Sequence, residues 1–335
     1  MILTVIRTLR SWFGPTIDAI FARNIPFDYR WRLLTFQPLA FISNCIGVIP
    51  YIFSRSYKVE YLPIAPGRSI RALVFDKARQ DRADKLRPLH LNIHGGAFIG
   101  GLPENSAPWC ARVAQETGAV VVSTEYRTAP RHTFPAAHDD VDAVLAYLRK
   151  NAVAKYGANP DLITVSGDSA GGNLALATAA SAPGAVKASV TFYAAINLQL
   201  PPWEKPKPAN FPQKDPLAVL LPLYDSYPGP VRHREINNPR MSPYLAKLEA
   251  LPENMLLVIA AIDIVVHEQL TFAERLKNEI ARDPKHAGRR VETLYVEKAF
   301  HGYLSCKYIA SISRILLLMW SFLQCSTGLY SITGA

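Results

Sequence analysis

Cysteine is scarce in this sequence, and acceptors for N-glycosylation are absent. The 335 residues include four cysteines, which stand far apart and form neither a C-x-x-C pair nor the dense set of a disulfide framework. No N-x-[ST] tripeptide occurs. Both features favour a reducing compartment, and we therefore expect a cytoplasmic protein.

Charged residues are also few, and they carry no nucleic-acid pattern. They make up 19% of the chain against 49% hydrophobic residues, which excludes an intrinsically disordered protein. The 26 prolines and 18 glycines follow no repeat, which excludes collagen-like and solenoid folds. The net charge of +10 is spread out, and even the densest basic stretch, 68–87, contains three aspartates and no zinc-finger or RNP motif. We expect no nucleic-acid partner.

The N-terminal segment lacks the uninterrupted apolar run of a signal peptide, because Arg7 and Arg10 break it. Its apolar residues recur at helical spacing, and Pro15 is expected to begin a second helical piece. The stretch 33–53 carries no charge and is long enough to span a bilayer, but polar residues, glycine and proline interrupt it. This favours a lid segment over a transmembrane helix. Peripheral membrane contact, at the endoplasmic reticulum or another membrane, is the alternative.

Short β-rich runs alternate with longer helical patterns through the middle of the chain. Several runs are apolar almost throughout, as strands covered on both faces must be. The alternation predicts an α/β protein with a mostly parallel sheet and helices on both faces. The predicted strands are 69–75, 88–93, 119–124, 162–166, 188–193, 255–260 and 291–296. The predicted helices are 106–117, 136–150, 170–181, 266–280 and 303–323.

Residues 201–230 break this rhythm with nine prolines. Because proline excludes both a central strand and a long helix, this segment is expected to leave the sheet and close over a site. The apolar run 315–323 is too short to span a bilayer and predicts a final helix packed on the sheet. The predicted division is N-terminal lid helices (1–56), a core (57–197 and 241–325), a lid insertion (198–240) and a C-terminal tail (326–335).

The sharpest motif is the G-D-S-A-G-G run at 167–172, between a predicted strand and a predicted helix. A serine at such a reversal has a strained backbone. The positions two before and two after it must be small, because strand and helix nearly touch there. Gly167 and Gly171 meet this demand, so Ser169 is the candidate nucleophile.

A nucleophilic serine needs backbone N–H groups already aimed at the oxyanion that forms during attack. The run His94-Gly95-Gly96 follows an earlier predicted strand, where the oxyanion loop of this chemistry is expected. We predict that the N–H groups of Gly95, Gly96 and Ala170 form the oxyanion hole. His94 is predicted to support the loop.

The serine also needs a base, and the base needs an acid that fixes its tautomer. Asp263 follows the sixth predicted strand and His301 follows the seventh. The chain order serine, aspartate, histidine suits this kind of sheet. We predict a catalytic set of Ser169, Asp263 and His301, with Glu268 as the alternative acid.

The other histidines do not indicate a metal site. His132, His138, Asp139 and Asp140 are spaced poorly for holding one ion, and no H-E-x-x-H motif occurs. His267 begins a predicted helix and is interpreted as a cap or surface residue. We expect neither a metal nor a cofactor.

Together these motifs resemble the hormone-sensitive-lipase-like family of α/β-hydrolase fold esterases, which includes arylacetamide deacetylases and carboxylesterases. The resemblance implies an eight-stranded, mostly parallel sheet and a helical lid made by the N-terminal helices and the insertion. Two positions depart from it: Ala97 stands where a third glycine is frequent, and His267 replaces an aspartate. The other matching runs are Tyr126-Arg127-Thr128-Ala129-Pro130, Phe134-Pro135-Ala136-Ala137, Asp139-Asp140 and Ser242-Pro243.

The resemblance implies a serine hydrolase that cleaves a small-molecule carboxylic ester through an acyl-enzyme. Phe98, Trp203 and Phe211 are expected in the substrate pocket and favour a small to medium apolar acyl or aryl ester. A tailoring step on a natural product is one form of this activity. The alternatives are a lactonase, an acyltransferase, a dehydratase or a non-catalytic small-molecule receptor on the same fold. The sequence does not determine the oligomeric state.

Overall fold

The computed structural model describes residues 2–52, 56–76, 86–215 and 218–305. At their centre lies an eight-stranded sheet with the strand order β1-β2-β4-β3-β5-β6-β7-β8. The β1–β2 and β2–β4 pairs are antiparallel, and the other five pairs are parallel. The strands are β1 (Lys58–Ala65), β2 (Arg68–Phe75), β3 (Arg87–Ile93), β4 (Val120–Thr124), β5 (Ala158–Asp168), β6 (Val186–Phe192), β7 (Asn254–Ile262) and β8 (Arg290–Phe300).

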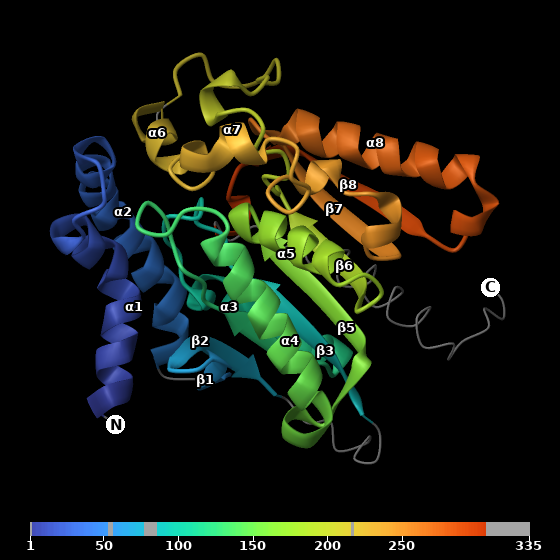
Figure 1. Cartoon of the computed structure of the whole chain (residues 1–335), viewed down its shortest axis with the longest axis horizontal. Helices are drawn as coiled ribbons and strands as arrows, with labels where there is room; N and C mark the ends of the chain where they lie inside the picture. Colours follow the sequence, from blue (N-terminus) through green and yellow to red (C-terminus); the bar gives the residue numbers. More distant parts are fainter. Residues whose placement is uncertain (1, 53–55, 77–85, 216–217, 306–335) are drawn as a thin grey trace.

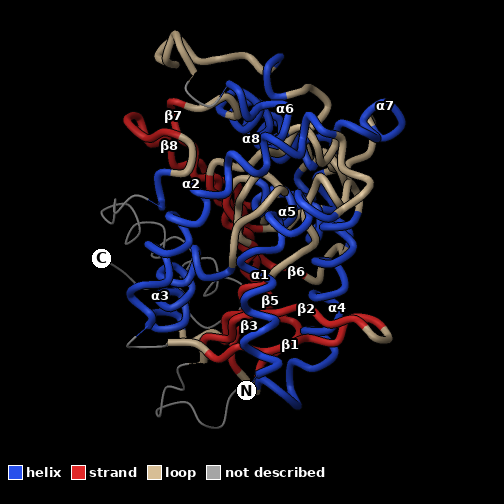
Figure 2. Tube along the Cα trace, turned by 90° about the vertical axis from the view of Figure 1, so that its left-hand side faces the viewer, coloured by secondary structure: helices blue, strands red, loops and turns tan. Residues whose placement is uncertain are grey.

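Helices cover both faces of this sheet (Figures 1 and 2). Leu91 and Val165 pack with Leu174 of α5 on one face, whereas Val121 packs with Val113 of α3 on the other. The predicted α/β architecture with a mostly parallel eight-stranded sheet is therefore confirmed. The helices of the core are α3 (Ala107–Thr117), α4 (Ala136–Tyr156), α5 (Ala170–Ser181) and α8 (Val266–Arg282), and the insertion contains the short α6 (Leu221–Tyr224) and α7 (Arg232–Glu235).

The N-terminal residues form a hairpin of α1 (Ile2–Phe21) and α2 (Phe27–Ile52), which lies beside the insertion in Figure 1. The prediction that Pro15 begins a second helical piece is wrong, because α1 continues through it. A proline inside a helix costs about 3 kcal/mol, and packing between the two helices, which buries Ala19 and Leu33, opposes that cost. Arg32 of α2 donates to the carbonyl of Val219, at 2.8 Å, and so joins the hairpin to the insertion.

The uncharged stretch that begins at Leu33 belongs to α2 as far as residue 52. Among the helices that the structure describes, none is long and apolar enough to cross a bilayer. Apolar side chains are exposed at the turn of the hairpin, where Phe21 is 74% and Phe27 is 78% exposed. Peripheral membrane contact through this segment stays a prediction.

The seven predicted strands and four of the five predicted helices are confirmed, with ends shifted by a few residues. β1 is absent from the predicted set, because this edge strand is mostly half-buried or exposed and lacks a clear apolar pattern. Of the fifth predicted helix, Tyr303–Ser305 form a 3-10 turn, and the rest lies outside the described residues, as does the tail 326–335. The division into core, lid helices and insertion stays a prediction.

Candidate active site

Ser169 occupies the sharp turn between β5 and α5 with a backbone φ of 52°. This left-handed conformation is uncommon for residues other than glycine. A Cβ on Gly167 would lie less than 3.0 Å from the backbone of Gly171, and a Cβ on Gly171 less than 3.0 Å from the carbonyl oxygen of Ile93. The turn therefore exists only because both positions lack a side chain.

A Gly171→Ala variant is expected to lower the free energy of unfolding by at least about 2 kcal/mol, because its methyl group would overlap the rigid end of β3. The matched control is Gly288→Ala, where nothing lies within 4 Å of the added Cβ. Urea unfolding of both variants checks this. Equal midpoints for Gly171→Ala and wild type would show that strand and helix are not in close contact at the turn.

Three side chains from separate strand ends meet at Ser169. The Ser169 Oγ lies 2.8 Å from Nε2 of His301, and Nδ1 of His301 lies 2.7 Å from Oδ2 of Asp263. Because an ionised carboxylate only accepts, Nδ1 carries the proton and Nε2 is left to accept from the serine hydroxyl. Asp263 is 1% exposed and also accepts from the N–H of Val265, at 3.1 Å, which fixes its orientation. The structure thus brings together the three residues predicted to act in catalysis.

The charge of Asp263 controls the proton affinity of His301. Burial lowers the pKa of His301, but the Asp263 charge and hydrogen bond outweigh it, so the pKa is raised above 6.5. A base must be neutral to accept a proton, and kcat/KM reports the ionisation of the free enzyme. We expect kcat/KM for ester hydrolysis to fall in acid with a midpoint above 6.5. A pH–rate profile with a midpoint well below 6.5 would contradict this assignment.

The oxyanion loop follows β3 and faces Ser169, but one predicted donor does not fit. The N–H of Gly95 donates to Oδ1 of Asp168, at 3.0 Å, and is therefore unavailable to an oxyanion. Within the described part of the chain, the N–H groups of Gly96 and Ala97 donate no hydrogen bond. The assignment of Gly95 is therefore wrong, and Ala97 takes its place in the candidate oxyanion hole with Gly96 and Ala170.

Asp168 is a residue of the candidate site that the sequence motifs did not single out. Its carboxylate joins the end of β5 to the oxyanion loop through Gly95. Burial raises its pKa to about 6, although the hydrogen bond from Gly95 opposes the rise. Its position between Gly167 and the nucleophile was the available signal, but sequence alone does not tell which backbone group it binds.

His94 holds the first residues of the same loop. Its Nδ1 lies 2.7 Å from the carbonyl oxygen of Gly95, and its ring stacks on Tyr126 with centroids 4.5 Å apart. Tyr126 in turn donates to the carbonyl of His94, at 3.0 Å. Burial lowers the pKa of His94 to about 4, so the ring is neutral at ordinary pH. These contacts suit support of the loop.

The remaining candidates are Glu268 and three aromatic residues. Glu268 pairs with Lys205, at 2.6 Å, and accepts from the N–H of Asn197, at 3.0 Å, so its carboxylate is engaged away from His301. Phe98 is buried and Trp203 is 49% exposed, while the ring of Phe211 lies below the Lys207 ammonium. Their place in a substrate pocket stays a prediction. The described residues contain no group of three potential metal ligands.

A family model described as alpha/beta hydrolase fold matches residues 90–305, which contain all of the site residues above. The chain belongs to the α/β-hydrolase fold family. Arylacetamide deacetylase of Oryctolagus cuniculus is 47% identical over 90 residues, which cover 26% of this α/β-hydrolase and 23% of the relative. Lipase 2 of Moraxella sp. is 28% identical over 291 residues, which cover 75% and 63% of the two chains.

A solved structure of the carboxylesterase EstE1, cloned from a metagenomic library, superposes with a TM-score of 0.69 at 27% identity. The superposition covers 90% of this α/β-hydrolase and 98% of EstE1. By contrast, the matches to the two curated relatives above span only 23% and 63% of those proteins' lengths. The resemblance to hormone-sensitive-lipase-like esterases that the motifs indicate is confirmed by these relatives.

Proposed function

We propose that this α/β-hydrolase is a carboxylic-ester hydrolase that forms an acyl-enzyme on Ser169. The observation that carries the proposal is the chain of contacts from Ser169 through His301 to the buried Asp263, at 2.8 and 2.7 Å. The relatives named as deacetylase, lipase and carboxylesterase support the same class of reaction. A receptor on this fold has no need of a base aligned on the serine, so the geometry favours an enzyme.

The steps of the reaction follow from which of Ser169, His301 and Asp263 can donate or accept a proton. Ser169 Oγ attacks the ester carbonyl carbon while Nε2 of His301 takes the hydroxyl proton, and Asp263 stabilises the imidazolium. The carbonyl π bond opens, and the resulting oxyanion accepts from the N–H groups of Gly96, Ala97 and Ala170. The oxyanion then re-forms the carbonyl and expels the alcohol, which takes the proton from His301. Water repeats the sequence on the acyl-enzyme, which releases the acid and restores Ser169.

The substrate class is the finer part of the proposal. The aromatic residues of the lid and the oxyanion loop, and relatives named arylacetamide deacetylase, support a small to medium apolar acyl or aryl ester. A natural-product ester would fall in this class. Hydrolysis of p-nitrophenyl esters from acetate to palmitate tests it, with an expected optimum at short to medium chains. An optimum at palmitate would indicate a lipase instead.

Product analysis separates hydrolysis from the other reactions that the same site could carry out. With water as the acceptor, the free acid and alcohol form in equal amounts. An acyltransferase would pass the acyl group to an added alcohol in preference to water, a lactonase would turn over lactones faster than open esters, and a dehydratase would release an alkene. We propose that water is the acceptor of the acyl group and that an open-chain ester, in contrast to a lactone, is the preferred substrate.

A further inference from the structure

The oxyanion loop holds two residues in a conformation that needs support from outside the loop. Ala97 has a φ of 52° and Phe98 a φ of 60°, in the left-handed region that costs a bulky residue of order 1 kcal/mol or more. Such a conformation persists only where surrounding contacts fix it. The carbonyl of Phe98 accepts from the N–H of Ala129, at 2.8 Å, which fixes one side of the loop.

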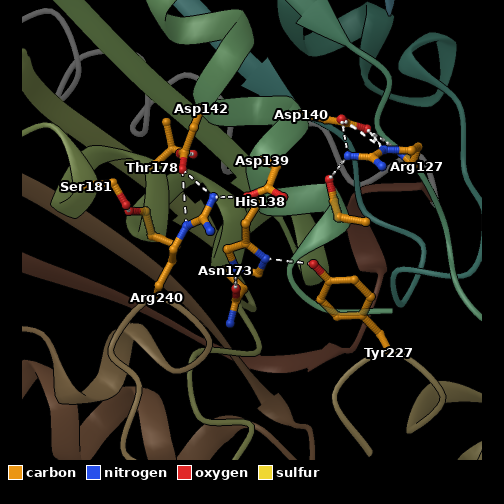
Figure 3. Close-up of polar contacts among 12 residues, drawn as sticks. Arg127, His138, Asp139, Asp140, Asp142, Asn173, Thr178, Ser181, Tyr227 and Arg240 are labelled. Carbon is orange, nitrogen blue, oxygen red and sulfur yellow. Dashed lines mark hydrogen bonds and ion pairs between the residues drawn. The ribbon is translucent and has the colours of Figure 1, made fainter. Parts of the chain in front are cut away.

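The other support comes from the Pro-rich insertion. The Tyr227 ring stacks on the Phe98 ring with centroids 4.3 Å apart and planes inclined by 10°, and both rings are buried. The carbonyl of Tyr227 accepts from the N–H of Phe134, at 3.1 Å. Its hydroxyl lies 2.8 Å from Nδ1 of His138. Figure 3 shows the two side chains pointing toward each other. Tyr227 is thus fixed at both ends, with its ring face against the loop.

His138 continues the connection to the helix that carries the nucleophile. Its Nε2 lies 3.1 Å from Oδ1 of Asn173, which is one turn after Ser169 in α5. The amide oxygen only accepts, so Nε2 carries the proton and Nδ1 accepts from the Tyr227 hydroxyl. Burial lowers the pKa of His138 to about 3, which agrees with a neutral ring.

Asn173 also binds the chain segments that flank the insertion on either side. Its Nδ2 donates to the carbonyl of Ala195, at 2.8 Å, where the chain leaves the sheet, and to the carbonyl of Met241, at 3.1 Å, where it returns. One buried network therefore runs from the two ends of the insertion through Asn173, His138 and Tyr227 to Phe98.

We propose that Tyr227 is a positioning residue through which the docked insertion holds the N–H groups of Gly96 and Ala97 in line with the oxyanion. The insertion then does more than cover the site, because the oxyanion hole is complete only while Tyr227 lies against Phe98. This inference rests on the proposed ester hydrolysis at Ser169.

A separate set of contacts keeps the insertion attached without Tyr227. Arg240, at its C-terminal end, pairs with Asp139 at 2.7 Å and with Asp142 at 2.6 Å, both on α4 (Figure 3). Asp142 also accepts from Thr178 of α5, at 2.6 Å. A Tyr227 variant should therefore keep the insertion anchored and lose only the support of the loop.

The test compares Tyr227→Leu, Tyr227→Phe and the control Tyr156→Leu, which removes another buried tyrosine, at the far end of α4. A fluorophosphonate titrates the reactive Ser169 to completion, so kcat is expressed per folded site. Because loss of one oxyanion donor costs about 10²- to 10³-fold in kcat, partial displacement in Tyr227→Leu should cost about 10- to 100-fold. KM should stay within about threefold, since the ground-state ester makes little use of these donors.

Two further measurements distinguish loss of oxyanion stabilisation from a general loss of activity. The inhibition constant of phenylboronic acid, which forms a tetrahedral adduct with the serine, should rise in Tyr227→Leu by the same factor as kcat falls. Tyr227→Phe keeps the ring stack and should lose less than about tenfold, and Tyr156→Leu should match wild-type kcat per site. Wild-type kcat per site in Tyr227→Leu, or a change confined to KM, would overturn the inference. Absence of ester turnover by the wild type would instead overturn the proposed function, and the inference with it.

Discussion

Replacing Ser169 by alanine is expected to lower kcat for ester hydrolysis by about 10⁴-fold or more, to the residual rate that binding and the oxyanion hole alone provide. The hydroxyl is the group of Ser169 that is hydrogen-bonded to His301, so its loss removes the covalent route while Asp263 and His301 stay paired. Initial rates with p-nitrophenyl acetate measure the effect.

The matched control is Ser181→Ala, at the other end of the same helix, where the hydroxyl donates to the carbonyl of Ala177. That variant should keep wild-type kcat. If Ser169→Ala and Ser181→Ala hydrolysed the ester equally fast, Ser169 would not be the nucleophile.

An Asp263→Asn variant is expected to lower kcat by about 10³- to 10⁴-fold with the fold intact. The amide can present an N–H to Nδ1 of His301 and so place the ring proton on Nε2, where it can no longer accept from Ser169. Removal of the negative charge also removes the largest of the contributions that raise the pKa of His301, so the acid limb of the pH–rate profile should move to lower pH.

The control for this variant is Asp161→Asn, an exposed aspartate in the first half of β5. It should leave both kcat and the acid limb unchanged. An Asp263→Asn variant with an unchanged acid limb would show that Asp263 does not set the protonation of His301. Near wild-type kcat would remove Asp263 from the catalytic set.

Most of the sheet could be predicted because its strands are buried on both faces and their apolar runs are continuous, as in Val120–Thr124. β1 escaped prediction because an edge strand with exposed side chains carries no such run. The break expected at Pro15 did not occur, because packing of α1 on α2 opposes the penalty of a proline inside the helix. A pattern of neighbouring residues does not report such packing between helices. Local sequence patterns predicted the elements correctly where a strand is buried along its whole length. They failed where contacts between distant residues opposed the local preference.

Prediction of the site residues from the sequence also succeeded for some residues and failed for others. Ser169, Asp263 and His301 could be chosen because each follows a strand in the expected order, and the strand ends bring them together. Gly95 was wrongly chosen as a donor because the direction of its N–H depends on Asp168, a contact between two strands that spacing does not reveal. The role of Tyr227 likewise depends on a stack between residues far apart in the chain.

The most direct test of the account is to look for the acyl group itself. Wild-type protein is mixed with excess p-nitrophenyl butyrate, quenched in acid during turnover and digested, and the peptides are analysed by mass spectrometry. The account predicts a butyryl ester on the peptide that contains Ser169, located on Ser169 by fragmentation and absent from Ser169→Ala. Turnover with no acyl group on this peptide, or with the group on another residue, would contradict the assignment of Ser169 as the nucleophile.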